Sequence, residues 1–191
     1  AALALCALGF PDEPVAAQIR TALGKHVDRM IAEARNPFGI TKQKANKEGE
    51  EGYFFEPSSA YGQSFLFACR AWSALCVYRL LGERRALEYA TDHLDFLLGK
   101  NPYNLCLLEA KGSLNPPRYH HRYDSIPGRK RGAVPGAIPN GFVRDSGSHD
   151  RPGFDNSRGG RDHPSYRTSE PWLVHDVFYL LAVTALEEAR P

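Results

Sequence analysis

Two long segments of the sequence carry apolar side chains on almost every side of a helical wheel. The first runs from 58 to 81, opening on Ser58 and closing at Gly82, and the second runs from 171 to 189. A helix that is apolar on all sides is buried, because it has no polar face to turn to water. The sequence therefore predicts two helices that other parts of a helical protein must surround.

Two further segments have the spacing of helices that are apolar on one side only. They run from 14 to 34 and from 83 to 98, where Gly99 ends the pattern. The apolar stretch 1–10 indicates the end of another buried helix, in a chain that looks cut from a longer one. Alternating buried and amphipathic helices predict a single all-α domain over 1–191, built as two concentric layers of helical hairpins. No alternating strand pattern of any length is present.

Charge and composition exclude two classes of partner. The 24 Lys and Arg residues nearly balance the 22 Asp and Glu residues, and the basic run Arg129–Arg131 is typical of a solvated turn, so no nucleic-acid partner is expected. The longest apolar run, 177–183, is far shorter than the roughly 20 residues of a membrane-spanning helix, so no membrane partner is expected. Four cysteines lack a paired spacing and are expected to be buried free thiols: Cys6, Cys69, Cys76 and Cys106.

The segment from Ser113 to Thr168 interrupts the helical pattern. Its 56 residues hold 7 of the 14 prolines and 8 of the 17 glycines, with aromatic and apolar residues among them. A loop longer than about 15 residues inside a compact domain is usually functional or disordered. The aromatic content favours an ordered loop that packs against the helices, and we expect it to form a wall or lid over a site.

Within this loop, Tyr119-His-His-Arg122 concentrates hydrogen-bond donors. In extended backbone His120 and Arg122 would share a face and His121 would oppose them. Surface or hydrogen-bonded histidines are one interpretation, and an anion or sugar-hydroxyl clamp is another. A metal site is less favoured, because no acidic or cysteine ligand lies at a characteristic spacing. The stretch Asp155–Asp162 does not match the twelve-residue calcium loop either, so a structural calcium ion has no support from spacing.

Glu170 is the second candidate. Proline favours the first position of a helix, so Pro171 predicts that Glu170 lies at or beside the N-cap of the last helix. One interpretation is simple stabilisation of the helix dipole by an acidic residue. The other is a carboxyl group aimed into a cavity beside Tyr166 and Trp172, since aromatic rings stack on sugars while an acid protonates the leaving oxygen.

Several stretches, in the same order, resemble the C-terminal half of a glycoside hydrolase family 9 catalytic domain, the family of many cellulases. The Pro-His-His-Arg signature of the family is matched at 115–122 and its Tyr-x-x-x-Glu signature at 166–170. The other matching stretches are Asn36-Pro-Phe-Gly39, Tyr61-Gly-Gln-Ser64, Leu94-Asp-Phe-Leu-Leu-Gly-Lys-Asn-Pro102 and Val134-Pro-Gly-Ala-Ile-Pro-Asn140.

The resemblance implies part of a six-hairpin (α/α) barrel and an enzyme that hydrolyses β-1,4-linked glucan with inversion, without a cofactor. Glu170 would be the general acid. The implied substrate is an oligosaccharide or polysaccharide. Sugar-binding residues would come from the two signatures and from the start of the inner helix: His120, His121, Arg122, Tyr61, Tyr166 and Trp172.

Two features depart from the family pattern. The paired aspartates that activate water in an inverting enzyme have no match, so we expect the isolated chain to hold the acid without the base. Asp92 and Asp95 have a similar spacing but the wrong place in the order. His175-Asp176 replaces the usual Tyr-Asn and puts the preference for cellulose in doubt. The alternative is a non-catalytic carbohydrate-binding or scaffold module. Half a barrel leaves inner helices uncovered, so we expect a homo-oligomer or association with a missing N-terminal half.

Overall fold

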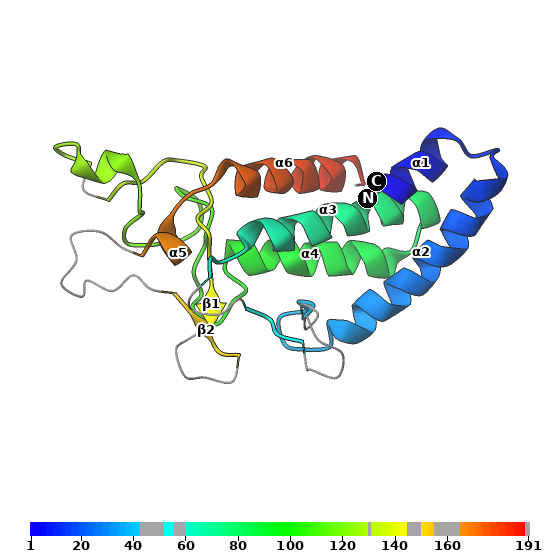
Figure 1. Ribbon diagram of the computed structural model, residues 1–191, viewed down its shortest axis with the longest axis horizontal. Coiled ribbons are helices and arrows are strands. Elements are labelled where there is room, and N and C mark those ends of the chain that lie inside the picture. The colour runs from blue at the N-terminus through cyan, green and yellow to red at the C-terminus, as the bar shows by residue number, and fades with distance from the viewer. Residues whose placement is uncertain (43–51, 56–59, 130, 145–149, 155–164, 190–191) are drawn as a thin grey trace.

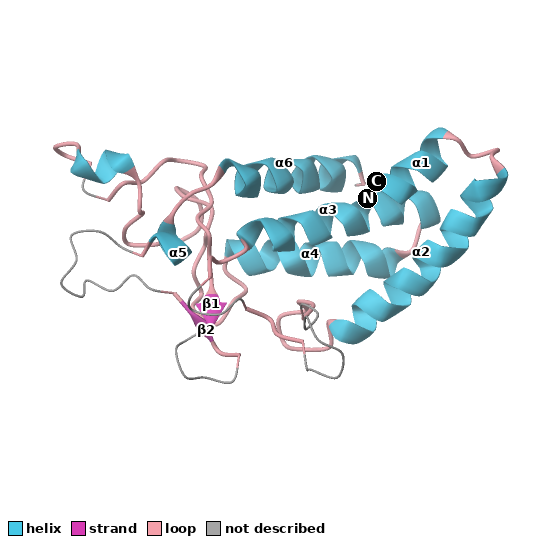
Figure 2. Cartoon of the chain, in the orientation of Figure 1, coloured by secondary structure: helices cyan, strands magenta, loops and turns pink. Residues whose placement is uncertain are grey.

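The computed structural model describes residues 1–42, 52–55, 60–129, 131–144, 150–154 and 165–189. Helices dominate the described residues, and two very short strands form a small sheet (Figure 2). The helices are α1 (Ala2–Gly9), α2 (Pro14–Glu33), α3 (Ser64–Leu81), α4 (Arg84–Leu98), α5 (Tyr166–Ser169) and α6 (Leu173–Glu188), with a 3₁₀ turn η1 (Arg122–Ser125) and strands β1 (Val143–Arg144) and β2 (Pro152–Gly153).

Helix α3 is the centre of the fold. It packs against α4 on one side and α6 on the other, and α3 and α6 run in the same direction while α4 runs in the opposite one (Figure 1). Small residues on α3, Ala68, Ala71 and Ala74, are completely buried and let the neighbouring helices approach closely. Gly82 ends α3 with a φ of 71°, a conformation that glycine adopts without strain, and the chain turns directly into α4. The all-α prediction is confirmed.

Helix α3 begins at Ser64, six residues later than the predicted start at Ser58. The reason is tertiary: the backbone N–H groups of Gly62 and Ser64 donate to the carbonyl oxygens of Arg167 (2.9 Å) and Asn140 (3.0 Å). These bonds hold residues 61–63 outside the helix. Helices α2 and α4 agree with their predicted ranges to within one residue.

The buried apolar residues form three clusters, and the third decides where the long loop lies. The first joins α1 and α2 to the end of α3, and the second joins α2, α4 and α6 to the middle of α3. In the third, Phe67 and Phe96 from the helices pack with Ile138 and Phe142 from the loop. Loop segments are therefore fixed at the end of the bundle where α3 and α6 begin, at the left of Figure 1.

The segment 113–168 is ordered wherever it is described, as predicted, but it contains more regular structure than the sequence indicated. The strands β1 and β2 pair antiparallel, with Val143 opposite Gly153 and Arg144 opposite Pro152. A strand pair of two residues each is too short to leave an alternating pattern in the sequence. Residues 145–149 and 155–164, which include the stretch compared with a calcium loop, lie outside the described residues.

The first and last helices are less buried than predicted. In α1 only Ala4 and Ala7 are buried, and Cys6 is exposed rather than buried. In α6 the side chains of Leu173 and Leu180 are 77% and 64% exposed, because within this chain α6 packs on α3 through one side only. The prediction that both helices are buried on all sides is wrong for this chain taken alone.

Helix α3 has the length and apolar composition of a membrane span, although half of it is buried inside the fold. The core helix of a globular protein meets the same criteria. Packing against α4 and α6 accounts for the composition, since Ala68, Ala71 and Leu75 are completely buried there.

Candidate active site

Three aromatic side chains from separate parts of the chain meet at the loop end of the bundle. The ring of Tyr61, just before α3, lies 5.0 Å from that of Trp172 and 5.7 Å from that of Tyr166, measured between centroids. Tyr166 is the first residue of α5 and Trp172 directly precedes α6. Tyr61 and Tyr166 are each about two-fifths exposed, at 43% and 40%, so part of their ring surface is open to solvent.

Glu170 belongs to the same group of side chains. The indole Nε1–H of Trp172 donates a hydrogen bond of 2.8 Å to Glu170 Oε2. This bond turns the carboxyl group toward the aromatic residues and fixes one of its two oxygens.

Glu170 is not at the start of a helix, so the predicted N-cap is wrong. It ends α5 in an extended conformation, with φ −80° and ψ 124°, and α6 begins only at Leu173. Pro171 lies in a β-bridge with Pro139 instead of taking the first helical position. The φ that proline favours is compatible with both environments, and the pairing with the loop decides between them. Stabilisation by the α6 dipole therefore does not apply to Glu170.

The three residues His120, His121 and Arg122 of the Pro-His-His-Arg signature lie in different surroundings. The backbone N–H of His120 donates to Ser169 O at 3.1 Å, and its ring meets Tyr166 edge-on at 5.8 Å, so His120 joins the aromatic group. The ring of His121 packs against Tyr123 at 4.4 Å, and its Nδ1 accepts the Tyr123 N–H. Arg122 is exposed at the start of η1.

Asn140 links the parts of this site and was not among the candidate residues. Its side chain and backbone are completely buried. The side-chain Nδ2 donates to Tyr166 O at 2.8 Å, the backbone N–H donates to Glu170 O at 2.9 Å, and the backbone carbonyl accepts from Ser64 N–H at 3.0 Å. One residue thus ties α5, Glu170 and the start of α3 together.

His175 is the second residue that was missed as a site residue, although the sequence marked it as a departure from the family pattern. Its Nδ1 accepts the backbone N–H of Phe65 at 2.9 Å, and its Nε2 lies 2.8 Å from Asn140 Oδ1. Its ring is parallel to that of Trp172, at 5.9 Å. Complete burial lowers the pKa of His175 to about 4, because the charged form would lose its hydration.

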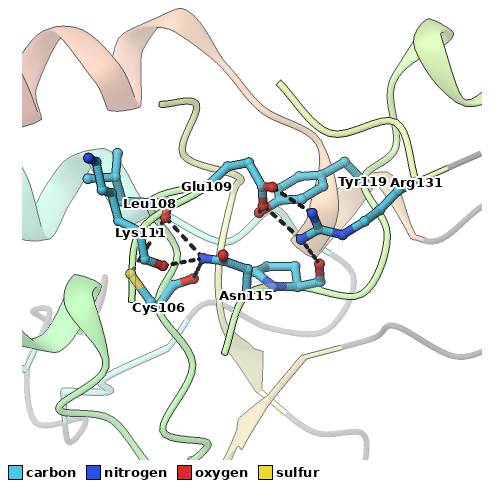
Figure 3. Close-up of polar contacts among 8 residues, drawn as sticks. Cys106, Leu108, Glu109, Lys111, Asn115, Tyr119 and Arg131 are labelled. Carbon is cyan, nitrogen blue, oxygen red and sulfur yellow. Dashed lines mark hydrogen bonds and ion pairs between the residues drawn. The ribbon is translucent and has the colours of Figure 1, made fainter. Parts of the chain in front are cut away.

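The segment that leads into His120 is held by an ion pair between the buried Glu109 and the partly exposed Arg131 (Figure 3). Arg131 donates from Nη1 and Nη2 to the two oxygens of Glu109 at 2.6 and 2.8 Å, and from Nη2 to Pro116 O at 2.8 Å. The Tyr119 hydroxyl also donates to Glu109 Oε2, at 2.6 Å. Burial, with the neighbouring carboxylate, raises the pKa of Tyr119, so it remains a donor. Arg129 is exposed in a turn, as predicted for the basic run, but the Arg131 side chain is bonded to Glu109 instead of being free in solvent.

The same close-up shows how the preceding turn is closed. The side-chain Nδ2 of Asn115 lies within hydrogen-bond distance of three backbone carbonyl oxygens, those of Cys106, Leu108 and Lys111 (Figure 3). A buried carboxylate and an amide therefore fix this part of the loop from both sides, and Tyr119 places His120 beside Tyr166.

Over the described part of the chain, no group of three or more His, Cys, Asp or Glu side chains is placed to hold a metal ion. Asp92, one of the two carboxylates with the spacing of the missing base, lies on α4 and forms an ion pair with Lys100. Glu170 is bonded to one of the three aromatic residues, Trp172.

Of the comparisons with known proteins, the one with solved structures finds the fold. No protein-family model and no curated protein matches the sequence. Among solved structures, a family 9 glycoside hydrolase of Bacteroides ovatus is 21% identical with a TM-score of 0.64, over 92% of this chain and 29% of that chain. Endoglucanase CelQ from Clostridium thermocellum, solved with cellobiose and cellotriose, is 20% identical with a TM-score of 0.60, over 100% and 30%.

A metagenome-derived family 9 endoglucanase gives a similar result, at 20% identity and a TM-score of 0.64, over 91% of this chain and 30% of that chain. The chain thus has the fold of one segment of the family 9 endoglucanases, which are (α/α)₆ barrels. It spans about three-tenths of the length of these solved chains. The resemblance read from the sequence is confirmed at the level of the fold.

Proposed function

We propose that this chain is part of a glycoside hydrolase that cleaves β-1,4-linked glucan or a related oligosaccharide with inversion, and that Glu170 is its general acid. The observation that carries the proposal is the hydrogen bond from Trp172 to Glu170 within a cluster of three aromatic rings, on a family 9 fold. The solved complex of CelQ with cellobiose and cellotriose supports an oligosaccharide as the ligand class.

The geometry provides for the chemistry of a general acid. The Trp172 indole N–H donates to Oε2 of Glu170, and Oε1 has no hydrogen bond to the described residues. Oε1 is therefore the oxygen that would carry the proton to the leaving glycosidic oxygen. Tyr61 and Tyr166 offer ring faces for the apolar side of a pyranose. His120, next to Tyr166, would donate to a sugar hydroxyl, and we propose the same class of contact for His121 and Arg122.

We propose that the general base lies outside these 191 residues. An inverting enzyme needs a second carboxylate about 6.5–9.5 Å from the acid, with room for a water molecule between them. The chain corresponds to about three-tenths of the length of the solved enzymes, and Asp92 is engaged with Lys100 on α4. The chain alone should therefore bind sugar and hydrolyse none.

The test compares this chain alone with the same chain mixed with the remaining segment of its gene product, on natural cello-oligosaccharides. Activity only in the mixture is expected. In that mixture Glu170→Gln should lower turnover about 100- to 10,000-fold, the usual contribution of a positioned acid. Glu88→Gln, which changes an exposed carboxylate paired with Arg84, is the matched control and should leave turnover unchanged.

The outcomes distinguish a catalytic role of the chain from a binding role. Turnover of Glu170→Gln close to that of the unchanged chain would refute the role of Glu170, and hydrolysis by the chain alone would refute the missing base. Sugar binding without hydrolysis in the mixture would support the alternative, a carbohydrate-binding module of the same fold.

We also propose that another polypeptide covers the apolar face of α6, defined by Leu173, Val177, Leu180 and Leu181. These residues share one side of the helix and are between 38% and 77% exposed. An apolar patch of this kind is usually an interaction surface. The partner is a second copy of the chain or the missing half of the barrel. Light scattering that shows a monomer at high concentration, unchanged by the remaining segment, would refute this proposal.

A further inference from the structure

His175 forms hydrogen bonds in two directions, and their chemistry defines its protonation state. A backbone N–H can only donate, so the Nδ1 that faces Phe65 N–H must be the unprotonated nitrogen. The proton of the neutral ring is then on Nε2, and it is donated to Asn140 Oδ1. The orientation of the Asn140 amide follows, because its Nδ2 donates to Tyr166 O.

The same ring touches the residue that holds Glu170. Trp172 lies parallel to His175, with an angle of 2° between the rings, and donates from Nε1 to Glu170 Oε2. Asn140 also contacts Glu170, because its backbone N–H donates to Glu170 O. Both routes from His175 therefore end at Glu170, one at the carboxyl group and one at the backbone.

His175 also stabilises the start of α3. The first N–H groups of a helix have no partner within it, and here Phe65 N–H is satisfied by an imidazole from α6. Because this bond and the bond to Asn140 use different nitrogens, the structural role and the positioning role can be separated by substitution.

We propose that His175 is a positioning residue that sets, through Asn140 and Trp172, the place of the Glu170 carboxyl group and the backbone of Tyr166. The proposal rests on the proposed function only in treating Glu170 as the acid. His175 acts through other residues, since it contacts Trp172 and Asn140, and each of these is bonded to Glu170. Its effect is to hold the Glu170 carboxyl group and the backbone of Tyr166 at fixed positions relative to the start of α3.

Asp176, the next residue of α6, accepts the Ile138 N–H and faces the loop. From the start of α3 the ring meets a backbone N–H, and Glu170 and His120 lie beyond Trp172 and Tyr166 respectively. The neutral tautomer is thus held by the two hydrogen bonds and by burial.

Two substitutions separate the two bonds. The amide of asparagine reaches the place of Nδ1, so His175→Asn keeps an acceptor for Phe65 N–H and loses the donor to Asn140. The amide of glutamine reaches the place of Nε2, so His175→Gln keeps the donor and loses the acceptor. If His175 only stabilises the start of α3, His175→Gln should be the more harmful change, because it loses the acceptor for Phe65 N–H. If His175 positions Glu170, His175→Asn should be the more harmful change, because it loses the donor to Asn140.

The primary measurement is nuclear magnetic resonance on the 191-residue chain, which needs no activity. The imidazole ¹⁵N shifts should show His175 protonated at Nε2 and unprotonated at Nδ1 at pH 7. The indole N–H of Trp172, assigned with Trp72→Phe, should be protected from exchange. That protection should fall about fivefold to tenfold in His175→Asn, the worth of about one hydrogen bond, and by less than about twofold in His175→Gln.

A proton on Nδ1, or equal protection of the Trp172 indole in the unchanged chain and His175→Asn, overturns the proposal. So does a greater loss in His175→Gln than in His175→Asn. Titration with cellotriose separates this proposal from the proposed function: if the unchanged chain binds no sugar while the tautomer and the indole protection are as expected, the function fails and the role of His175 stands.

Discussion

Replacing Arg131 by methionine should destabilise the chain by about 2–4 kcal/mol. The change removes two hydrogen bonds to Glu109 and one to Pro116 O, and it leaves a carboxylate whose side chain is only 5% exposed with the Tyr119 hydroxyl as its remaining donor. Removing one partner of a buried ion pair costs about 3–5 kcal/mol, because the other charge stays buried. Arg131 is 42% exposed, so water can partly replace it, and the expected loss is smaller.

Urea unfolding followed by circular dichroism measures this loss. With a slope of about 2–3 kcal/mol per molar urea, the midpoint should fall by about 1 M. Arg129→Met, in the same turn and exposed, is the matched control and should shift the midpoint by less than about 0.2 M, within the usual range for surface changes. Adding Glu109→Gln to Arg131→Met should recover part of the loss, since no unpaired charge then remains.

A loss below about 1 kcal/mol for Arg131→Met, the range of an exposed ion pair, would refute the reasoning. So would a double substitution that is less stable than the single one, since the cost is assigned to an unpaired carboxylate. The reasoning also connects stability to the site, because Tyr119 is bonded to Glu109 and directly precedes His120.

Gly62→Ala should destabilise the chain by about 1–3 kcal/mol, because a Cβ at this position would lie 2.5 Å from the backbone oxygens of Asn140 and Gly141. Gly24→Ala, within α2 and without such a contact, is its control, and equal urea midpoints for the two variants would contradict this packing. Stability should also fall as the pH is lowered from 7 to 5. Burial lowers the pKa of His93 to about 3 and that of His175 to about 4, so below pH 6.5 the unfolded chain binds protons that the folded chain does not, at about 1.4 kcal/mol per pH unit for each histidine. Urea midpoints that stay constant or rise from pH 7 to pH 5 would contradict it.

The helices could be predicted because their signal is local. Residues 14–34 and 83–98 repeat apolar side chains every three to four positions, and Gly82 and Gly99 end helices through their own conformational freedom. The Tyr-x-x-x-Glu and Pro-His-His-Arg stretches likewise identified Glu170, Tyr166 and His120 as residues of one site. The structure brings these three together, and their catalytic and binding roles remain predictions.

Other features depend on partners that are distant in the sequence. No capping residue marks the starts of α3 and α6. The late start of α3 follows from the bonds of Gly62 N–H to Arg167 O and of Ser64 N–H to Asn140 O, and that of α6 from the Pro139–Pro171 bridge beside the bond from Asn140 N–H to Glu170 O. Arg131 looked like part of a solvated turn because Glu109, its partner, lies 22 residues earlier. The apolar side chains of α6 are exposed because, within this chain, α6 packs against α3 on one side only. The composition of α6 does not show which neighbouring helices are present.

The sequence by itself determined the all-α class, the order of the helices and the residues at which a sugar site should be sought, because periodicity and short motifs are properties of neighbouring residues. Only the tertiary structure decided how that site is held. The neutral ring of His175 and the buried amide of Asn140 join three separate segments, namely the start of α3, the loop at Asn140 and residues 166–175, and the Trp172 bond to Glu170 lies within the last of them. Hydrogen bonds and burial between such segments exist only once the chain has folded, so no local pattern can encode them.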